Sequence, residues 1–97
     1  MSRAKDIKKG LKKTMKVITA MKESRSPNNT KCLVKITKKL SLEINCQRVD
    51  WKDDPNYGMP LGFEIYAIKD SRAVDCATID TNGNFEEDIL YLLNCYI

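Results

Sequence analysis

The residue types that most often perform acid–base or nucleophilic chemistry are scarce in this 97-residue chain. It contains no histidine, which removes the commonest general base and the cysteine–histidine pair of thiol enzymes. The motifs GxGxxG, GxxxxGK[ST] and GxSxG are absent. Asp53 and Asp54 could help to hold a metal ion, but adjacent aspartates before a proline are typical of solvated turns. We therefore expect no enzyme, with no catalytic residues, cofactor or metal.

The cysteines also give no strong sign of a metal site. The chain has four cysteines and no CxxC pair. They are Cys32, Cys46, Cys76 and Cys95. Each lies in the apolar phase of its segment, as small buried hydrophobic residues do. We expect reduced thiols in a core, with disulfides in a secreted protein as the alternative.

Basic residues are concentrated near the N-terminus. Residues 1–26 contain nine basic and two acidic residues, a net charge of +7, and the other 71 residues carry a net charge of −3. At helical spacing one face would carry the lysines Lys5, Lys8, Lys9, Lys12, Lys13 and Lys16. Such a face matches the phosphates of DNA or RNA and gives salt-dependent affinity without reading bases. The segment has no Asn or Gln to read adenine edges and no aromatic residue to stack on single-stranded bases.

The lysine face has other interpretations. It could be a solvated surface that keeps a small domain soluble. It could also grip an acidic protein surface, or the acidic C-terminal region of a second copy in a homodimer. A membrane-surface helix is disfavoured because the apolar side has no Trp or Phe.

A second candidate surface is the loop at residues 50–62, which is rich in proline, glycine and aspartate. Its large side chains include Trp51, Tyr57 and Met59, and such residues on an exposed loop often anchor protein interfaces. The alternative is that Trp51 folds back over the open end of a small core.

The elements that must position these residues follow from hydrophobic periodicity. A basic amphipathic helix is predicted at about 3–24, and Gly10 in its middle means that it depends on docking to a sheet or a partner. A linker at 24–29 follows, and then alternating residues predict a sheet over about 30–80. A final helix is predicted at about 85–95, with Asn84 and Glu87 as a capping box.

The strand pairing has one open and one clear part. In residues 30–48 a two-residue turn at Lys38 and Lys39 would put the two apolar sets on opposite faces, whereas an odd-length loop or one long bent strand keeps them together. We favour a hairpin over the long strand. A second hairpin is predicted to turn at Asp70 and Ser71, with an inward face formed by Phe63, Ile65, Ala67, Val74, Cys76 and Thr78.

Together these elements predict one α+β domain spanning residues 1–97, with an antiparallel sheet of about four strands and both helices on one sheet face. No apolar run reaches the ~18 residues of a membrane span, and the N-terminus lacks the apolar segment of a signal peptide, so we expect a cytoplasmic protein that does not contact a membrane.

We therefore expect a small non-enzymatic protein that binds nucleic acid, or an acidic surface of a nucleic-acid-handling protein, through its lysine-rich helix. The alternative is a protein–protein inhibitor or adaptor, of the kind that viruses and mobile elements encode, which occludes a larger enzyme through the Trp51 loop.

Overall fold

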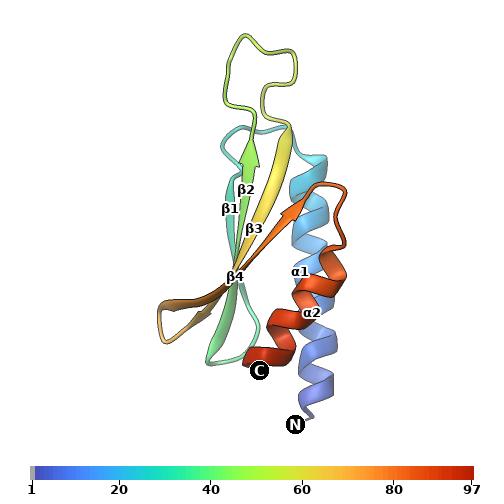
Figure 1. The fold of residues 1–97 in the computed structure, drawn as a ribbon, viewed down its shortest axis with the longest axis vertical. Helices are drawn as coiled ribbons and strands as arrows, with labels where there is room; N and C mark the ends of the chain where they lie inside the picture. The colour runs from blue at the N-terminus through green and yellow to red at the C-terminus, as the bar shows by residue number, and fades with distance from the viewer. Residues whose placement is uncertain (1) are drawn as a thin grey trace.

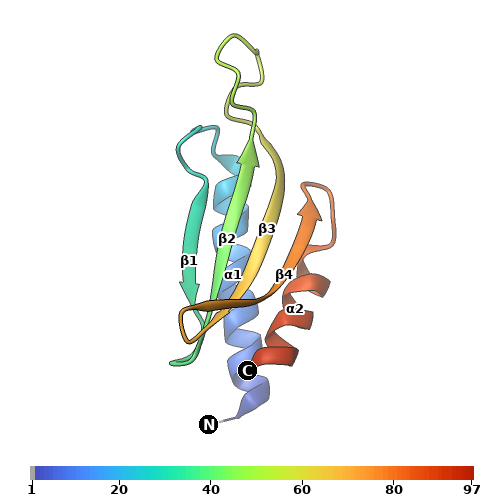
Figure 2. The ribbon, with the colours of Figure 1, turned by 60° about the vertical axis from the view of Figure 1, so that its left-hand side comes forward.

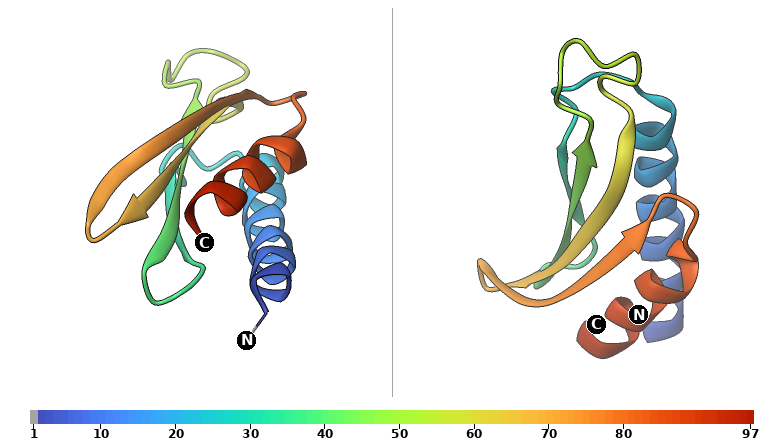
Figure 3. Two further views of the ribbon diagram at one scale, coloured as in Figure 1. Left: turned by 60° about the horizontal axis from the view of Figure 1, so that its bottom comes forward. Right: turned by 45° about the horizontal axis from the view of Figure 1, so that its top comes forward.

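The computed structural model describes residues 2–97, which form two helices and one sheet (Figure 1). In chain order the elements are α1 (Arg3–Glu23), β1 (Lys31–Lys35), β2 (Leu40–Arg48), β3 (Pro60–Lys69), β4 (Arg72–Asp80) and α2 (Phe85–Tyr96). The strands form an antiparallel meander in the order β1-β2-β3-β4, and both helices pack on the same face (Figures 2 and 3). The predicted α+β architecture is confirmed.

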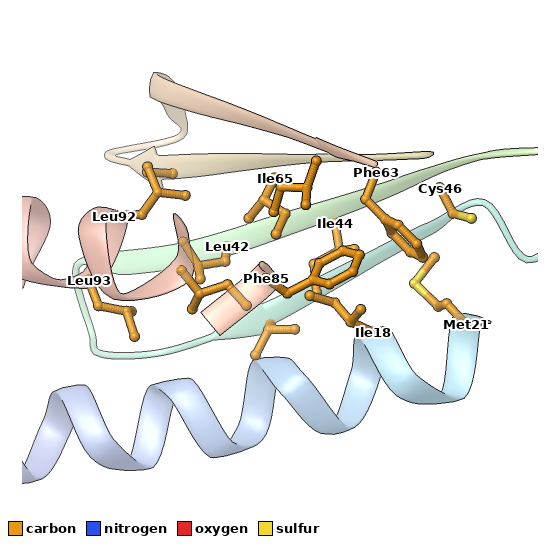
Figure 4. Close-up of a cluster of buried hydrophobic side chains, with 14 of the residues drawn as sticks. Ile18, Met21, Leu42, Ile44, Cys46, Phe63, Ile65, Phe85, Leu92 and Leu93 are labelled. Carbon is orange, nitrogen blue, oxygen red and sulfur yellow. The ribbon is translucent and has the colours of Figure 1, made fainter. Parts of the chain in front are cut away.

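A single hydrophobic core lies between the sheet and the two helices (Figure 4). Alternate residues of β2 and β3, such as Leu42, Ile44 and Ile65, point to the helices and are fully buried. The rings of Phe63 and Phe85 meet edge to face, with centroids 5.3 Å apart. This aromatic contact joins the central strand β3 to the first turn of α2.

Both helices begin at capping residues that the sequence supplies. In α1, Ser2 Oγ accepts a hydrogen bond from the amide of Lys5. In α2, Asn84 Oδ1 accepts one from the amide of Glu87, and this cap was predicted.

No helix among residues 2–97 is both long and apolar enough to cross a bilayer.

Gly10 lies where α1 packs against both the residue after β1 and α2. It is buried, and a Cβ atom there would lie 3.1 Å from Ile36 Cγ2 and 3.4 Å from Leu93 Cδ2. A glycine in the middle of the helix thus permits α1 to approach the end of β1 and α2 closely. The apolar side of α1 docks on the chain's own sheet.

The first hairpin has an odd-length loop. Lys35 pairs with Ser41, so the connection is centred on Lys38. The predicted hairpin is therefore confirmed, and the two-residue turn at Lys38 and Lys39 is wrong. With this register Val34 of β1 and Leu42 of β2 face the same core.

The second hairpin turns where predicted, but β4 faces the other way. Asp70 and Ser71 have φ angles of 53° and 64°, as a type I′ turn requires, and Lys69 pairs with Arg72. Ile68 then pairs with Ala73 and Ala67 with Asp75, so Val74 is an extra residue. This bulge inverts the alternation, and the predicted inward set Val74, Cys76 and Thr78 is exposed while Ala77 and Ile79 pack on the core.

The bulge also corrects the prediction that all cysteines are buried. Cys46 is buried and Cys32 is half-buried, but Cys76 and Cys95 are exposed. Cys76 is exposed because the inverted alternation points it to the open sheet face, and Cys95 because it lies outside the inward stripe of α2.

Candidate nucleic-acid interface

All six predicted lysines of α1 are exposed, but they point in different directions. Because Gly10, Thr14 and Ile18 form the buried side of the helix, the 100° residue spacing puts Lys9 and Lys13 on one flank. This flank faces the end of β1, where the Nζ atom of Lys13 donates a hydrogen bond to the carbonyl oxygen of Lys35 at 3.0 Å.

The loop between β1 and β2 brings two further lysines to this flank. The amides of Ile36 and Thr37 both donate to the carbonyl oxygen of Leu40, and Thr37 Oγ1 accepts from the amides of Lys39 and Leu40. These contacts fix a tight loop in which Lys38 and Lys39 are exposed.

Three of these lysines, Lys9, Lys38 and Lys39, line a cavity of about 500 Å³ at one end of the molecule. Lys69 completes the ring because it follows Ala67 on the helix-covered face of β3. We call this surface the basic end and define it by five residues: Lys9, Lys13, Lys38, Lys39 and Lys69. The hollow itself, the end cavity, is lined by Lys9, Lys38, Lys39 and Lys69, with Ile36, Thr37, Tyr96, Ile97 and one acidic side chain, Asp6.

No lysine of the basic end forms an ion pair with a carboxylate among residues 2–97. Among residues 2–97 the single ion pair within 4.0 Å joins Lys31 to Glu43 on the other sheet face. The amino groups of these lysines are therefore available to attract an external anion, over the ~8 Å Debye length of physiological salt.

The Trp51 loop lies at the opposite end of this elongated molecule, which measures 50 × 23 × 16 Å (Figure 1, top). Trp51 is 67% exposed, so the alternative, that it folds back over the open end of the core, is wrong. Met59 is 40% exposed and Tyr57 is half-buried. Leu61 was not predicted as a site residue but is 59% exposed on β3 next to the loop. The two predicted surfaces are thus separate.

Arg48 holds the Trp51 loop against the end of α1. It is 8% exposed, and its guanidinium donates to the carbonyl oxygens of Met21, Ser24, Asn29 and Gly58 at 2.7–2.8 Å. Two of these carbonyls belong to the C-terminal end of α1, where the helix dipole favours a cation. A buried positive charge is therefore satisfied entirely by backbone oxygen atoms.

The sheet face opposite the helices is open and mostly polar, although Leu33 is also exposed there. It carries Lys31, Lys35, Glu43, Asn45, Gln47, Glu64 and Tyr66. The hydroxyl of Tyr66 donates to Glu64 Oε2 at 3.3 Å, and the nearby Glu64 carboxylate is the main cause that raises the pKa of Tyr66. With one aromatic ring beside two carboxylates, this face is less suited to an anionic ligand than the basic end.

Sequence reasoning identified Lys9 and Lys13 but missed Lys38, Lys39, Lys69 and Tyr96. The adjacent lysines in the predicted turn were a usable signal, since turn residues project to solvent. No local sequence signal identifies Lys69 or Tyr96 as cavity residues, because their positions beside the cavity depend on where β3 and α2 end in the fold.

Within residues 2–97 no three His, Cys, Asp or Glu side chains gather as metal ligands. Comparison with protein-family models, curated proteins and solved structures finds no match to this chain.

Proposed function

We propose that this chain is a non-enzymatic cytoplasmic protein that binds nucleic acid through its basic end. The observation that carries the proposal is the convergence of lysines from α1, the β1-β2 loop and β3 around one cavity, with no carboxylate within 4.0 Å of their amino groups among residues 2–97.

A cluster of this kind fits the phosphate backbone better than it fits a solubility role. Lysines from three separate segments surround one concave surface, whereas a solvated face needs only dispersed charge. The outward lysines Lys5, Lys12 and Lys16 extend the positive surface along α1. Each phosphate that a lysine neutralises releases counterions, so binding should weaken steeply with salt.

The test is binding of labelled duplex DNA and single-stranded RNA from low to high salt. We expect affinity to fall with salt, and the double variant Lys9→Glu/Lys13→Glu to abolish binding at moderate salt. The matched control is Lys22→Glu/Lys52→Glu, which makes the same charge change far from the basic end and should weaken binding much less. Absence of binding at low salt would refute the proposal.

The exposed Trp51 favours a second candidate function, a protein–protein inhibitor or adaptor of viral or mobile-element type. An indole that is 67% exposed, with Met59 and Leu61 also exposed nearby along the chain, is typical of an interface anchor. In that case Trp51→Ala and Tyr57→Ala should cost ~2 kcal/mol or more of partner affinity, while the lysine reversals matter little. Under the nucleic-acid proposal the opposite pattern is expected.

A further inference from the structure

We infer that the end cavity accepts an unpaired nucleotide, so that the protein prefers single-stranded nucleic acid to duplex. The inference rests on the proposed function and names its substrate class. It concerns the apolar and aromatic residues that line the end cavity, which the charge of the basic end alone does not explain.

The walls of the end cavity combine the two chemistries of a nucleotide. Ile36, Ile97 and the ring of Tyr96 supply apolar surface, and Lys9, Lys38, Lys39 and Lys69 supply cations. A base needs an apolar or aromatic surface, and its flanking phosphates need positive charge. Tyr96 thus provides the aromatic residue that α1 lacks.

The aromatic wall is held in place before any ligand binds. The hydroxyl of Tyr96 donates to Asp75 Oδ2 at 2.9 Å, which joins the end of α2 to β4. The guanidinium of Arg3 donates to the carbonyl oxygen of Asn94 in the last turn of α2, and so ties this turn to the start of α1. A ring fixed in this way loses little conformational freedom when a base packs against it.

The size and form of the cavity discriminate between unpaired and paired bases. Its volume of about 500 Å³ lies within the usual range of small-ligand pockets, roughly 300–1,000 Å³. In a duplex the bases are stacked and paired, so only their edges are accessible in the grooves. An unpaired base can leave the stack and enter a hollow, with its phosphates on the lysine rim. Asp6 is the one acidic side chain in the wall, and four lysine side chains outweigh it.

The experiment measures fluorescence anisotropy of 12-nucleotide oligo(dT) and oligo(U) and of a 12-base-pair duplex at low salt. We expect single strands to bind at least tenfold more tightly than the duplex. Lys38→Glu/Lys39→Glu should weaken single-strand binding at least tenfold and reduce the slope of log K against log salt by about 1.4. The control Lys12→Glu/Lys16→Glu makes the same charge change on the outer side of α1 and should weaken it less.

The apolar wall is tested separately. Tyr96→Phe keeps the ring and should bind normally, while Tyr96→Leu should lose about tenfold. Because Tyr96 also packs on the core, a readout on the wild-type protein is needed: titration with oligo(dT) should shift the methyl NMR signals of Ile36 and Ile97.

The outcomes separate the two proposals. Preference for single strands together with methyl shifts supports the inference. Equal, salt-dependent binding of duplex and single strands without methyl shifts refutes the cavity and leaves the nucleic-acid proposal standing. No binding of any nucleic acid at low salt refutes both, and binding of an acidic peptide in its place would give the basic end a protein partner.

Discussion

Replacing Arg48 with methionine is the most informative test of the packing between α1 and the Trp51 loop. Methionine keeps much of the aliphatic stem and removes the guanidinium. Four carbonyl oxygens, those of Met21, Ser24, Asn29 and Gly58, then lose their donor. Three separate segments of the chain lose their shared contact in one substitution.

The expected loss follows from the number and kind of these bonds. Hydrogen bonds to a charged group contribute ~1.5–3 kcal/mol each, but the buried charge also costs desolvation energy, and some freed carbonyls can reach water. We expect a net loss of about 3–4 kcal/mol in the free energy of unfolding. A domain of this size has a total of only about 5–15 kcal/mol, so the midpoint temperature should fall by more than about 12 °C.

The measurement is urea unfolding followed by far-ultraviolet circular dichroism, with thermal unfolding beside it. The control is Arg25→Met, which removes an exposed guanidinium with one hydrogen bond, to the carbonyl oxygen of Pro55 at 3.0 Å. That variant should lose less than about 1 kcal/mol. If Arg48→Met costs no more than Arg25→Met, the role assigned to Arg48 is wrong.

Three further predictions concern single positions. Gly58 has a φ angle of 84°, and a Cβ there would overlap the carbonyl oxygen of Arg25, so Gly58→Ala should cost more than about 2 kcal/mol in urea unfolding. The control is Gly62→Ala, where a Cβ would make only an ordinary contact, 3.5 Å from the carbonyl oxygen of Ile79, and this variant should cost less. Thr14 is fully buried and its hydroxyl finds no hydrogen-bond partner within residues 2–97. Thr14→Val should therefore raise the free energy of unfolding by about 1 kcal/mol. A decrease in the free energy of unfolding would show that the hydroxyl does have a hydrogen-bond partner. Burial raises the pKa of the Cys46 thiol above its ordinary 9.0, outweighing the opposite effect of Arg48, so the folded state holds this proton more tightly than the unfolded chain. Stability should therefore fall as the pH rises above 9, and Cys46→Ala should remove that part of the decline in a pH series of unfolding curves.

Local sequence was sufficient to predict both helices and the cap of α2. The apolar spacing of residues 3–24 predicted α1 within one residue of its observed end at Glu23, and Asn84 with Glu87 marked the start of α2. These features depend on neighbours within one or two helical turns, so the sequence contains them directly.

Strand phase was predictable only where the pairing is regular. The turn at Asp70 and Ser71 was predicted, but the extra residue Val74 reversed the faces of Cys76 and Ile79. A bulge leaves no clear local mark, because the side-chain period of two survives on both sides of it.

The sequence by itself determined that this is an α+β chain with a lysine-rich first helix, because periodicity and charge are properties of neighbouring residues. Only the tertiary structure decided which lysines act together. The odd-length loop of the first hairpin carries Lys38 and Lys39 to the flank of Lys9, and the end of α2 adds Tyr96. The tertiary structure also places the Trp51 loop at the opposite end from these lysines, because α1 and β2 run along most of the length of the molecule (Figure 1). Arg48 holds that loop against the last turn of α1 through the carbonyl oxygens of Gly58 and Met21.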